Sequence, residues 1–151
     1  MAAIERVREE HLHELLPLMR AYCDFYGVDP PDDDLTRMSR ALIADPECDG
    51  LQLLARDESG RAVGFATIFW SWSTLRAGRV GVMNDLFVDA GARGGGTADQ
   101  LIEACAQYCR ERGDVVSLGW QTAKDNRRAQ AVYERVGARR SEWLDYTLEL
   151  D

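Results

Sequence analysis

"LFVDAGARGGGTADQLIEAC", residues Leu86–Cys105, joins an apolar strand pattern to an amphipathic helix through three consecutive glycines. Glycines in a row cost backbone entropy in any ordered state, so we expect them to let a ligand approach the backbone closely. A strand-to-helix loop presents unpaired backbone N–H groups and the positive end of the helix dipole. The stretch therefore predicts a site for phosphate or pyrophosphate, to which Arg93 adds a positive charge. A flexible glycine turn with a solvated arginine is the alternative.

Two familiar phosphate-binding motifs do not fit this loop. A P-loop requires a lysine after its glycines, and none follows here. A dinucleotide fingerprint fits Gly94 and Gly96, but its third glycine position holds Asp99. The register that fits is R-x-x-G-x-A, with Arg93, Gly96 and Ala98.

A second motif, "WQTAKDNRRAQAVYERVGA", spans Trp120–Ala138. Helical spacing places Asn126, Ala129 and Tyr133 on one stripe, and Gly137 is the expected residue after the helix. An amide, a small residue and a phenol on one face suit a ligand lying across the helix. The alternative is that Asn126 caps the helix and Tyr133 belongs to the core.

The apolar periodicity along the chain predicts an α/β (α+β) fold, with a mixed, mostly antiparallel sheet flanked by helices. The expected order is β-α-α-β-β-β-α-β-α-β(β). We expect Pro17 to start or kink the first helix and Asp33 or Asp34 to cap the second. The expected strands cover residues 2–7, 51–56, 61–72, 79–88, 115–122 and 138–150, and the expected helices cover 10–26, 33–44, 98–112 and 126–136.

The two motifs together resemble the GNAT superfamily of acetyl-CoA-dependent N-acetyltransferases, weakly its polyamine- and histone-acetylating branch. The resemblance implies one domain, residues 1–151, that moves acetyl from acetyl-CoA to a primary amine by direct attack. It further implies that the strands at 82–88 and 115–122 splay apart to admit pantetheine, and that Tyr133 is the general acid. The acetyl-CoA-binding residues so implied are Leu86, Phe87, Val88, Arg93, Gly94, Gly95, Gly96, Thr97, Ala98, Asn126 and Ala129.

The general base is where the sequence departs from the resemblance. Asn84 stands where polyamine-type members carry a glutamate, and an amide cannot accept the proton. Asp85 is the adjacent carboxylate, but strict strand alternation points it to the other face unless a bulge intervenes. Glu142 and Trp72 are further candidates to line the acceptor site, with a solvent-facing role and core or dimer packing as their alternatives. A non-catalytic acyl-CoA sensor on the same fold is the rival function.

The composition argues against nucleic-acid binding, a metal site and membrane association. The net charge is −8, with 26 acidic and 18 basic residues, which argues against a nucleic-acid surface and suits a small cationic acceptor. The two histidines, His11 and His13, do not pair in spacing with the four cysteines, so we expect free thiols and no metal. The charged N-terminal stretch lacks the continuous apolar run of a signal peptide, and no apolar run is long enough to cross a membrane. We therefore expect a cytoplasmic protein without membrane partners, and a homodimer is compatible with the sequence.

Overall fold

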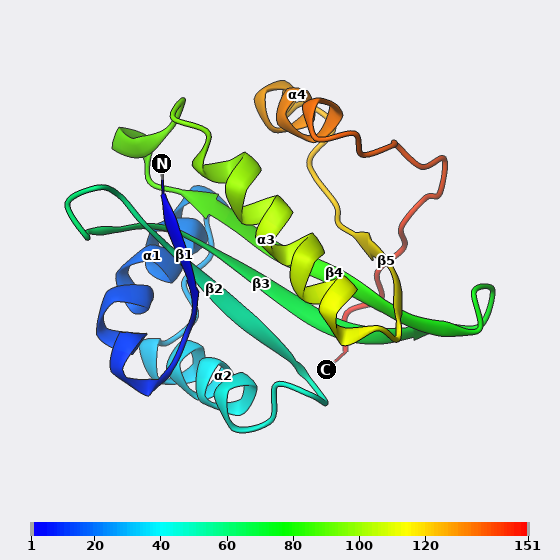
Figure 1. The fold of residues 1–151 in the computed structure, drawn as a ribbon, viewed down its shortest axis with the longest axis horizontal. Helices are drawn as coiled ribbons and strands as arrows, with labels where there is room; N and C mark the ends of the chain where they lie inside the picture. Colours follow the sequence, from blue (N-terminus) through cyan, green and yellow to red (C-terminus); the bar gives the residue numbers. More distant parts are fainter. Residues whose placement is uncertain (1, 151) are drawn as a thin grey trace. The chain divides into compact units, whose positions relative to one another are not determined.

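The computed structural model describes residues 2–150. Within it the chain divides into two compact units, of which the first ends at Gln121 and the second begins at Thr122. Figure 1 colours both units along the sequence. The first unit contains the sheet and the glycine loop, so most of the predicted site lies there.

Five strands of the described chain form one sheet, in the order β1-β2-β3-β4-β5. Successive strands from β1 to β4 pair antiparallel, whereas β4 and β5 run parallel and are connected through the crossover helix α3 (Thr97–Arg112). The strands are β1 Ala3–Arg6, β2 Gly50–Arg56, β3 Ala62–Ser73, β4 Gly78–Val88 and β5 Val115–Gly119. The predicted mixed, mostly antiparallel sheet is confirmed.

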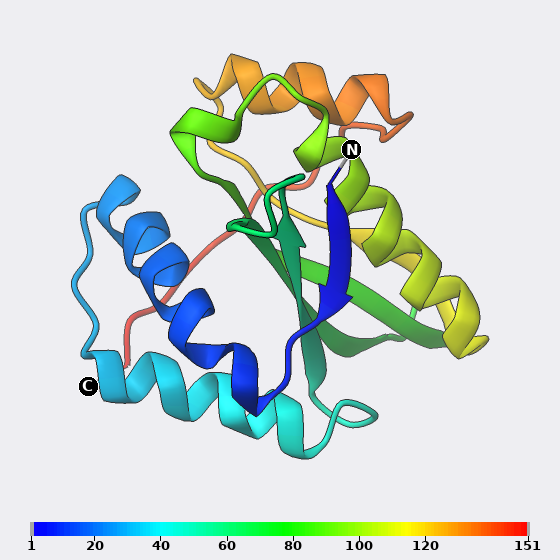
Figure 2. The ribbon, with the colours of Figure 1, turned by 60° about the vertical axis from the view of Figure 1, so that its left-hand side comes forward.

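Helices cover both faces of this sheet. Helices α1 (Leu12–Phe25) and α2 (Asp32–Ala44) pack on one face, and α3 packs on the other (Figure 2). The turn η1 (Glu9–His11) precedes α1. The core on the α1 side consists of Val7, Leu15, Leu18, Met19, Leu54, Phe65 and Phe87. Burying each large apolar side chain contributes about 1.5–3 kcal/mol, which fixes α1 on the sheet, and Leu35, Met38 and Ile43 of α2 pack against the same core.

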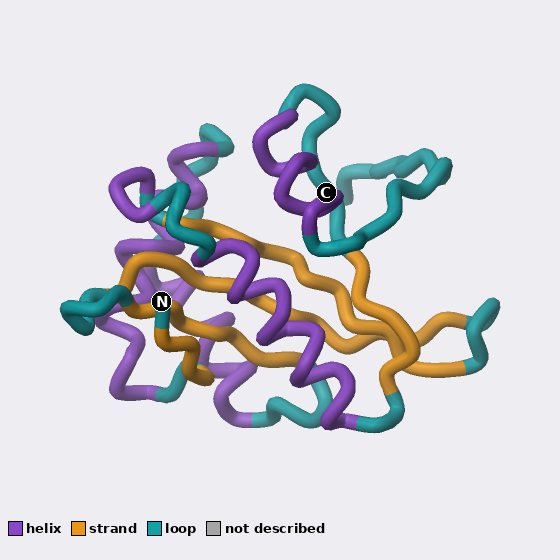
Figure 3. The backbone as a smooth tube through the Cα atoms, turned by 45° about the horizontal axis from the view of Figure 1, so that its top comes forward, coloured by secondary structure: helices purple, strands orange, loops and turns teal. Residues whose placement is uncertain are grey.

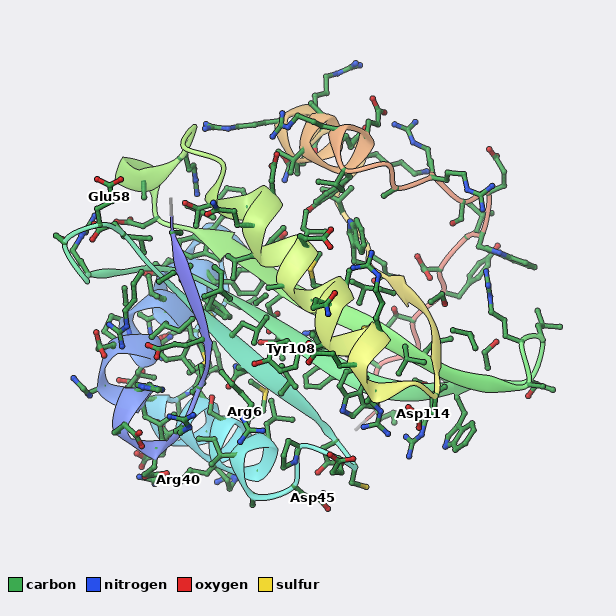
Figure 4. All side chains as sticks on the ribbon, in the orientation of Figure 1. Arg6, Arg40, Asp45, Glu58, Tyr108 and Asp114 are labelled. Atoms are coloured by element: carbon green, nitrogen blue, oxygen red, sulfur yellow. The ribbon has the colours of Figure 1, made fainter. Side chains whose placement is uncertain are left out.

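The starts of helices α1 and α2 differ from the sequence predictions. Pro17 lies inside α1 and does not start it. Neither Asp33 nor Asp34 caps α2, because the helix begins earlier, at Asp32, with Pro31 at its N-cap. Three carboxylates then fall in the first turn, where they stabilise the helix dipole by charge. Helix α3 ends at Arg112, as predicted, with Gly113 as its C-cap, and Arg112 Nε donates to Asp114 at 2.8 Å in the turn to β5 (Asp114 is labelled in Figure 4).

The second unit contains helix α4 (Arg127–Arg135) and an extended tail. The predicted strand or strands at 138–150 are wrong, because these described residues form neither helix nor strand (Figure 3). The alternating apolar pattern that suggested a strand leaves Trp143 and Tyr146 80% and 91% exposed. A strand needs a neighbour to satisfy its backbone groups, and this segment pairs with none among the described residues.

Candidate active site

Strand β4 contains a bulge directly beside the carboxylate of Asp85. Thr67 of β3 pairs with Asp85, but the next residue, Ile68, pairs with Met83, so Asn84 is an extra residue in β4. Asn84 is exposed, whereas Asp85 is only 7% exposed. Strict alternation therefore fails between Met83 and Asp85, and Asp85 shares with Phe87 the face that α1 covers.

Asp85 is enclosed by hydrogen-bond donors. Asn84 Nδ2 donates to Asp85 Oδ1 at 3.0 Å, and the Thr67 and Tyr22 hydroxyls also hydrogen-bond the carboxylate. Burial raises the pKa of Asp85 above its ordinary value, and these three hydrogen bonds oppose the rise. A buried carboxylate with a raised pKa is a stronger base than an exposed one, which is typical of catalytic positions.

Tyr22 of α1 brings a phenol to the same place. Its hydroxyl donates to the Asn84 carbonyl at 3.5 Å, and its ring packs edge-on against Phe65 and Phe87. Burial raises the pKa of the Tyr22 phenol, and the nearby charge of Asp85 raises it further. The phenol therefore stays protonated at neutral pH and acts as a donor.

Sequence reasoning missed three residues around Asp85. Tyr22 was indistinguishable from the other apolar residues that repeat at helical spacing in its helix. Gln52 and Thr67 are buried polar residues inside apolar strands, and Gln52 Nε2 donates to Thr67 Oγ1 at 3.1 Å. A polar residue in "LQLL" and another in "FATIF" were the available signals.

Strands β4 and β5 separate next to this carboxylate. Their pairing runs from Arg79 with Val115 to Val82 with Gly119 and stops there. From Met83 to Val88, β4 has no strand partner on that side among the described residues. The predicted splay is confirmed, and Leu86, Phe87 and Val88 lie on the open edge.

The glycine loop follows directly from the open edge of β4. Gly94 and Gly96 have φ of +88° and +84°, a conformation that favours glycine. The first helical hydrogen bond of α3 runs from Gln100 N to Gly96 O, so the helix makes no use of the Thr97 and Ala98 amides. A Cβ added at Gly94 or Gly96 would meet no atom within 4 Å. The loop thus combines unused donors with open room.

Arg93 is held at the junction of β4 and the loop. Its Nε donates to the Val88 carbonyl at 2.9 Å, and its guanidinium lies 5.9 Å from the centre of the Phe87 ring. The charge is therefore fixed at the end of β4, beside the short helical turn η2 (Ala90–Ala92) that opens the loop.

Helix α4 of the second unit has the predicted ends. Asn126 Oδ1 accepts from Ala129 N at 3.2 Å, so the capping interpretation of Asn126 is confirmed. Gly137, at φ +85°, donates to Glu134 O at 3.0 Å, and Ala138 N donates to Tyr133 O at 3.0 Å. These two bonds form a Schellman motif, as the position of Gly137 predicted.

Comparison with known proteins identifies the family. The sequence matches the Acetyltransferase (GNAT) family over residues 12–138, which is most of the chain and includes both the glycine loop and α4. The chain belongs to the GNAT family. It is therefore an acyltransferase, and the relatives that it resembles are named N-acetyltransferases.

Three similarities support this membership. The chain is 29% identical to the uncharacterized N-acetyltransferase YhfO of Bacillus subtilis (strain 168), over 89% of this chain and 87% of that protein. It is 34% identical to the D-amino-acid N-acetyltransferase HPA3 of Saccharomyces cerevisiae, over 72% of this chain and 66% of that protein. The crystal structure of a probable acetyltransferase superposes with a TM-score of 0.85 at 33% identity, covering 99% of this chain and 98% of that one.

Trp72 and Glu142, the two other residues named for the acceptor site of this GNAT protein, are exposed. Trp72 is 69% exposed at the end of β3, with the Arg79 guanidinium 4.6 Å from its ring centre. Its strand neighbour Trp70 is buried and donates its Nε1 to the Pro46 carbonyl at 2.7 Å, whereas the exposure of Trp72 rules out a core role for Trp72. Glu142 lies in the extended tail.

Neither a metal cluster nor a membrane helix occurs in the described part of this GNAT chain. Residues 2–150 contain no group of three or more His, Cys, Asp or Glu side chains placed to hold a metal ion. All four cysteines are free thiols, with Cys48 the exposed one. No helix within these residues combines the length and apolarity needed to cross a bilayer.

Proposed function

We propose that this GNAT protein transfers an acetyl group from acetyl-CoA to a primary amine, by direct attack of the amine on the thioester. The observation that carries the proposal is Asp85, a buried carboxylate held at a strand bulge beside the open edge of β4. A carboxylate in this position supplies the base that the exposed amide of Asn84 cannot supply.

The acetyl-CoA site follows from the loop and the strand edge. The backbone amides at residues 94–98 bind the pyrophosphate, with Arg93 adding charge, and the pantetheine extends along Leu86–Val88 as an added strand. Gly94, Gly95 and Gly96 leave room for the phosphates, because little surrounds their Cα atoms. From the second unit we assign Asn126 and Ala129 to the same ligand; the capping role of the Asn126 oxygen leaves its amide nitrogen for that contact.

The chemical step requires two protons to leave an ammonium acceptor and one to reach the sulfur. An alkylammonium acceptor has a pKa near ~10.4 and must be deprotonated before attack. Asp85 accepts that proton, the nitrogen forms a bond to the acetyl carbon, and the C–S bond breaks as the tetrahedral intermediate collapses. A backbone N–H on the open edge of β4 stabilises the oxyanion. Tyr133 protonates the departing thiolate and recovers a proton from the second N–H of the attacking nitrogen, while Asp85 releases the first proton to water.

We propose the α-amine of an amino acid as the leading acceptor. The support is the relative named D-amino-acid N-acetyltransferase, which shares 34% identity over 72% of this chain. The carboxylates of Asp29, Asp32 and Asp34, before and within α2, do not argue for a polyamine, because they already form ion pairs within the protein. Arg20 pairs with Asp29 and Asp32, and Arg37 pairs with Asp34.

The test is acceptor-dependent release of CoA from acetyl-CoA. The panel holds D- and L-amino acids, polyamines, aminoglycosides and lysine peptides, with acetyl-CoA binding measured by calorimetry alongside. We expect release with amino acids, abolished in Asp85→Asn and retained in Asp33→Asn, which removes an exposed carboxylate of α2. Tight acetyl-CoA binding without release from any amine would instead favour the acyl-CoA sensor.

A further inference from the structure

A row of buried polar side chains crosses the sheet beneath α1 and α2. Gln52 of β2 is the cross-strand partner of Thr67 of β3, and Thr67 is the partner of Asp85 of β4. Their exposures are 2%, 0% and 7%. Directly opposite residues share one face of a sheet, so Thr67 lies next to both Gln52 and Asp85 on that face. Buried polar groups are costly unless they are hydrogen-bonded, which makes their bonding pattern informative.

The neighbouring row of side chains on the same face of the sheet is apolar. Two residues along each strand, Leu54 pairs with Phe65 and Phe65 pairs with Phe87, and all three are buried and apolar. The polar row is therefore a local exception within an apolar core, and it ends at Asp85.

The hydrogen bonds along this row have one direction. Gln52 Nε2 donates to Thr67 Oγ1 at 3.1 Å, so the Thr67 hydroxyl keeps its own proton to donate onward. Asp85 is the cross-strand partner of Thr67 on the next strand, and hydrogen bonding by the Thr67 hydroxyl lowers the pKa of the Asp85 carboxyl. An ionised carboxylate only accepts hydrogen bonds, so a donor fixed in this direction favours the charged form.

The other end of the row fixes the orientation of the Gln52 amide. Gln52 Nε2 also lies 3.7 Å from Met19 Sδ, and Ser39 Oγ lies 3.6 Å from the same sulfur. A thioether sulfur accepts but cannot donate, so it selects the amide nitrogen of Gln52 over its oxygen. Gln52 Oε1 is the one buried side-chain polar atom without a partner among the described residues. In this orientation Gln52 Oε1 is unpaired, and Gln52 Nε2 donates to Thr67, the neighbour of Asp85.

We propose that Gln52 and Thr67 are positioning residues that hold Asp85 as an ionised hydrogen-bond acceptor at the β4 bulge. This inference rests on the proposed function, in which Asp85 takes a proton from the acceptor amine. The row opposes the effect of burial, which would otherwise leave the carboxyl protonated and unable to act as a base.

The titratable groups around Asp85 do not compete with it. Helix α1 supplies the Tyr22 phenol and the Cys23 thiol, and Tyr26 packs against Tyr22 at a centroid distance of 5.0 Å. Burial raises the pKa of both Tyr22 and Cys23, and Arg20 partly opposes the rise at Cys23. From β2, β3 and α2 the row receives Gln52, Thr67 and Ser39, which do not titrate. Because both pKa values are raised, the phenol and the thiol stay neutral at neutral pH, and Asp85 is the acid of this cluster.

The experiment compares Thr67→Val with Thr67→Ser by two independent readings. The first is the carboxyl carbon chemical shift of Asp85 followed against pH in the protein without substrates, with Asp85→Asn identifying the signal. The second is the pH dependence of kcat/KM. Removing a hydrogen bond to the charged form should raise the Asp85 midpoint by about one to two pH units in Thr67→Val. The acidic limb of kcat/KM should move up with it, while Thr67→Ser stays at the wild-type midpoint.

Two further variants separate positioning from general damage to the core. Gln52→Leu should shift the midpoint in the same direction by a smaller amount, because Thr67 then loses the partner that orients it. Leu54→Val lies in the neighbouring apolar row and should lower stability without moving the midpoint. An unmoved or lowered midpoint in Thr67→Val would overturn the proposal. A midpoint that rises while the acidic limb stays in place would overturn Asp85 as the proton acceptor, so the two failures are distinct.

Discussion

Replacing Gly95 with alanine separates the binding role of the glycine loop from its folding role. Gly95 lies between two glycines with positive φ but does not share that conformation. A Cβ added there would have as its nearest neighbour the Ala92 carbonyl oxygen at 3.8 Å, an ordinary contact. The folded protein therefore accepts the methyl group, and lower entropy of the unfolded chain should add about 0.4–1 kcal/mol to the free energy of unfolding.

The same methyl group should hinder a bound pyrophosphate. If the phosphate oxygens accept from the loop amides, the added carbon disturbs at least one charge-assisted hydrogen bond, at a cost of about 1.5–3 kcal/mol. That cost corresponds to roughly 10- to 150-fold weaker binding of CoA. Calorimetric titration with CoA measures it, and titration with pantetheine, which lacks the pyrophosphate, should show little change.

Gly91→Ala is the matched control. Gly91 has no atom within 4 Å of an added Cβ and, like Gly95, no positive φ, but it precedes the glycine run. We expect wild-type CoA affinity for this variant. Equal, wild-type CoA affinity in both Gly95→Ala and Gly91→Ala would refute the assignment of the loop to the pyrophosphate.

Three other expectations concern the reacting groups. Asp85→Asn should lower kcat by about 10²–10⁴-fold with unchanged acetyl-CoA affinity, as measured by steady-state kinetics and calorimetry; unchanged kcat would remove Asp85 from the mechanism. The raised pKa of Asp85 means that the folded protein binds its proton more tightly than the unfolded chain does. Wild-type stability relative to Asp85→Asn should therefore decline as pH rises from about 4 through the raised pKa, which urea unfolding at several pH values can check. Tyr133→Phe should lower turnover strongly with little loss of CoA affinity, whereas weaker CoA binding with normal turnover would argue against its role as general acid.

The parts of the fold that local sequence determines were predictable. The glycine run and the helix after it follow from backbone conformation and apolar spacing, and the end of α4 at Gly137 follows from the left-handed residue that a Schellman motif requires. These features depend on residues within a few positions of one another. The assignment of the loop to acetyl-CoA came from family resemblance, because glycines and one arginine alone suit many anions.

The parts that depend on pairing between distant segments were not predictable. Nothing in "MNDLFV" reveals that Asn84 is an extra residue, because a bulge is defined by the register of the partner strand. Gln52 and Thr67 are distant in sequence from Asp85, and only the strand register brings the three together. The predicted strand at 138–150 was wrong for a related reason. Its alternating apolar pattern is compatible with a strand, but the pattern does not show whether a partner strand exists.

The bulge at Asn84 also bears on how the protein avoids aggregation. An open strand edge such as Met83–Val88 presents backbone groups to which a strand of another molecule can add, and this is a common starting point for aggregates. A bulge increases the local twist and interrupts the regular spacing of those groups, which makes the edge a poor template for continued pairing. The irregularity that turns Asp85 into the protein thereby also limits self-association at the edge that the proposed cosubstrate requires to be open.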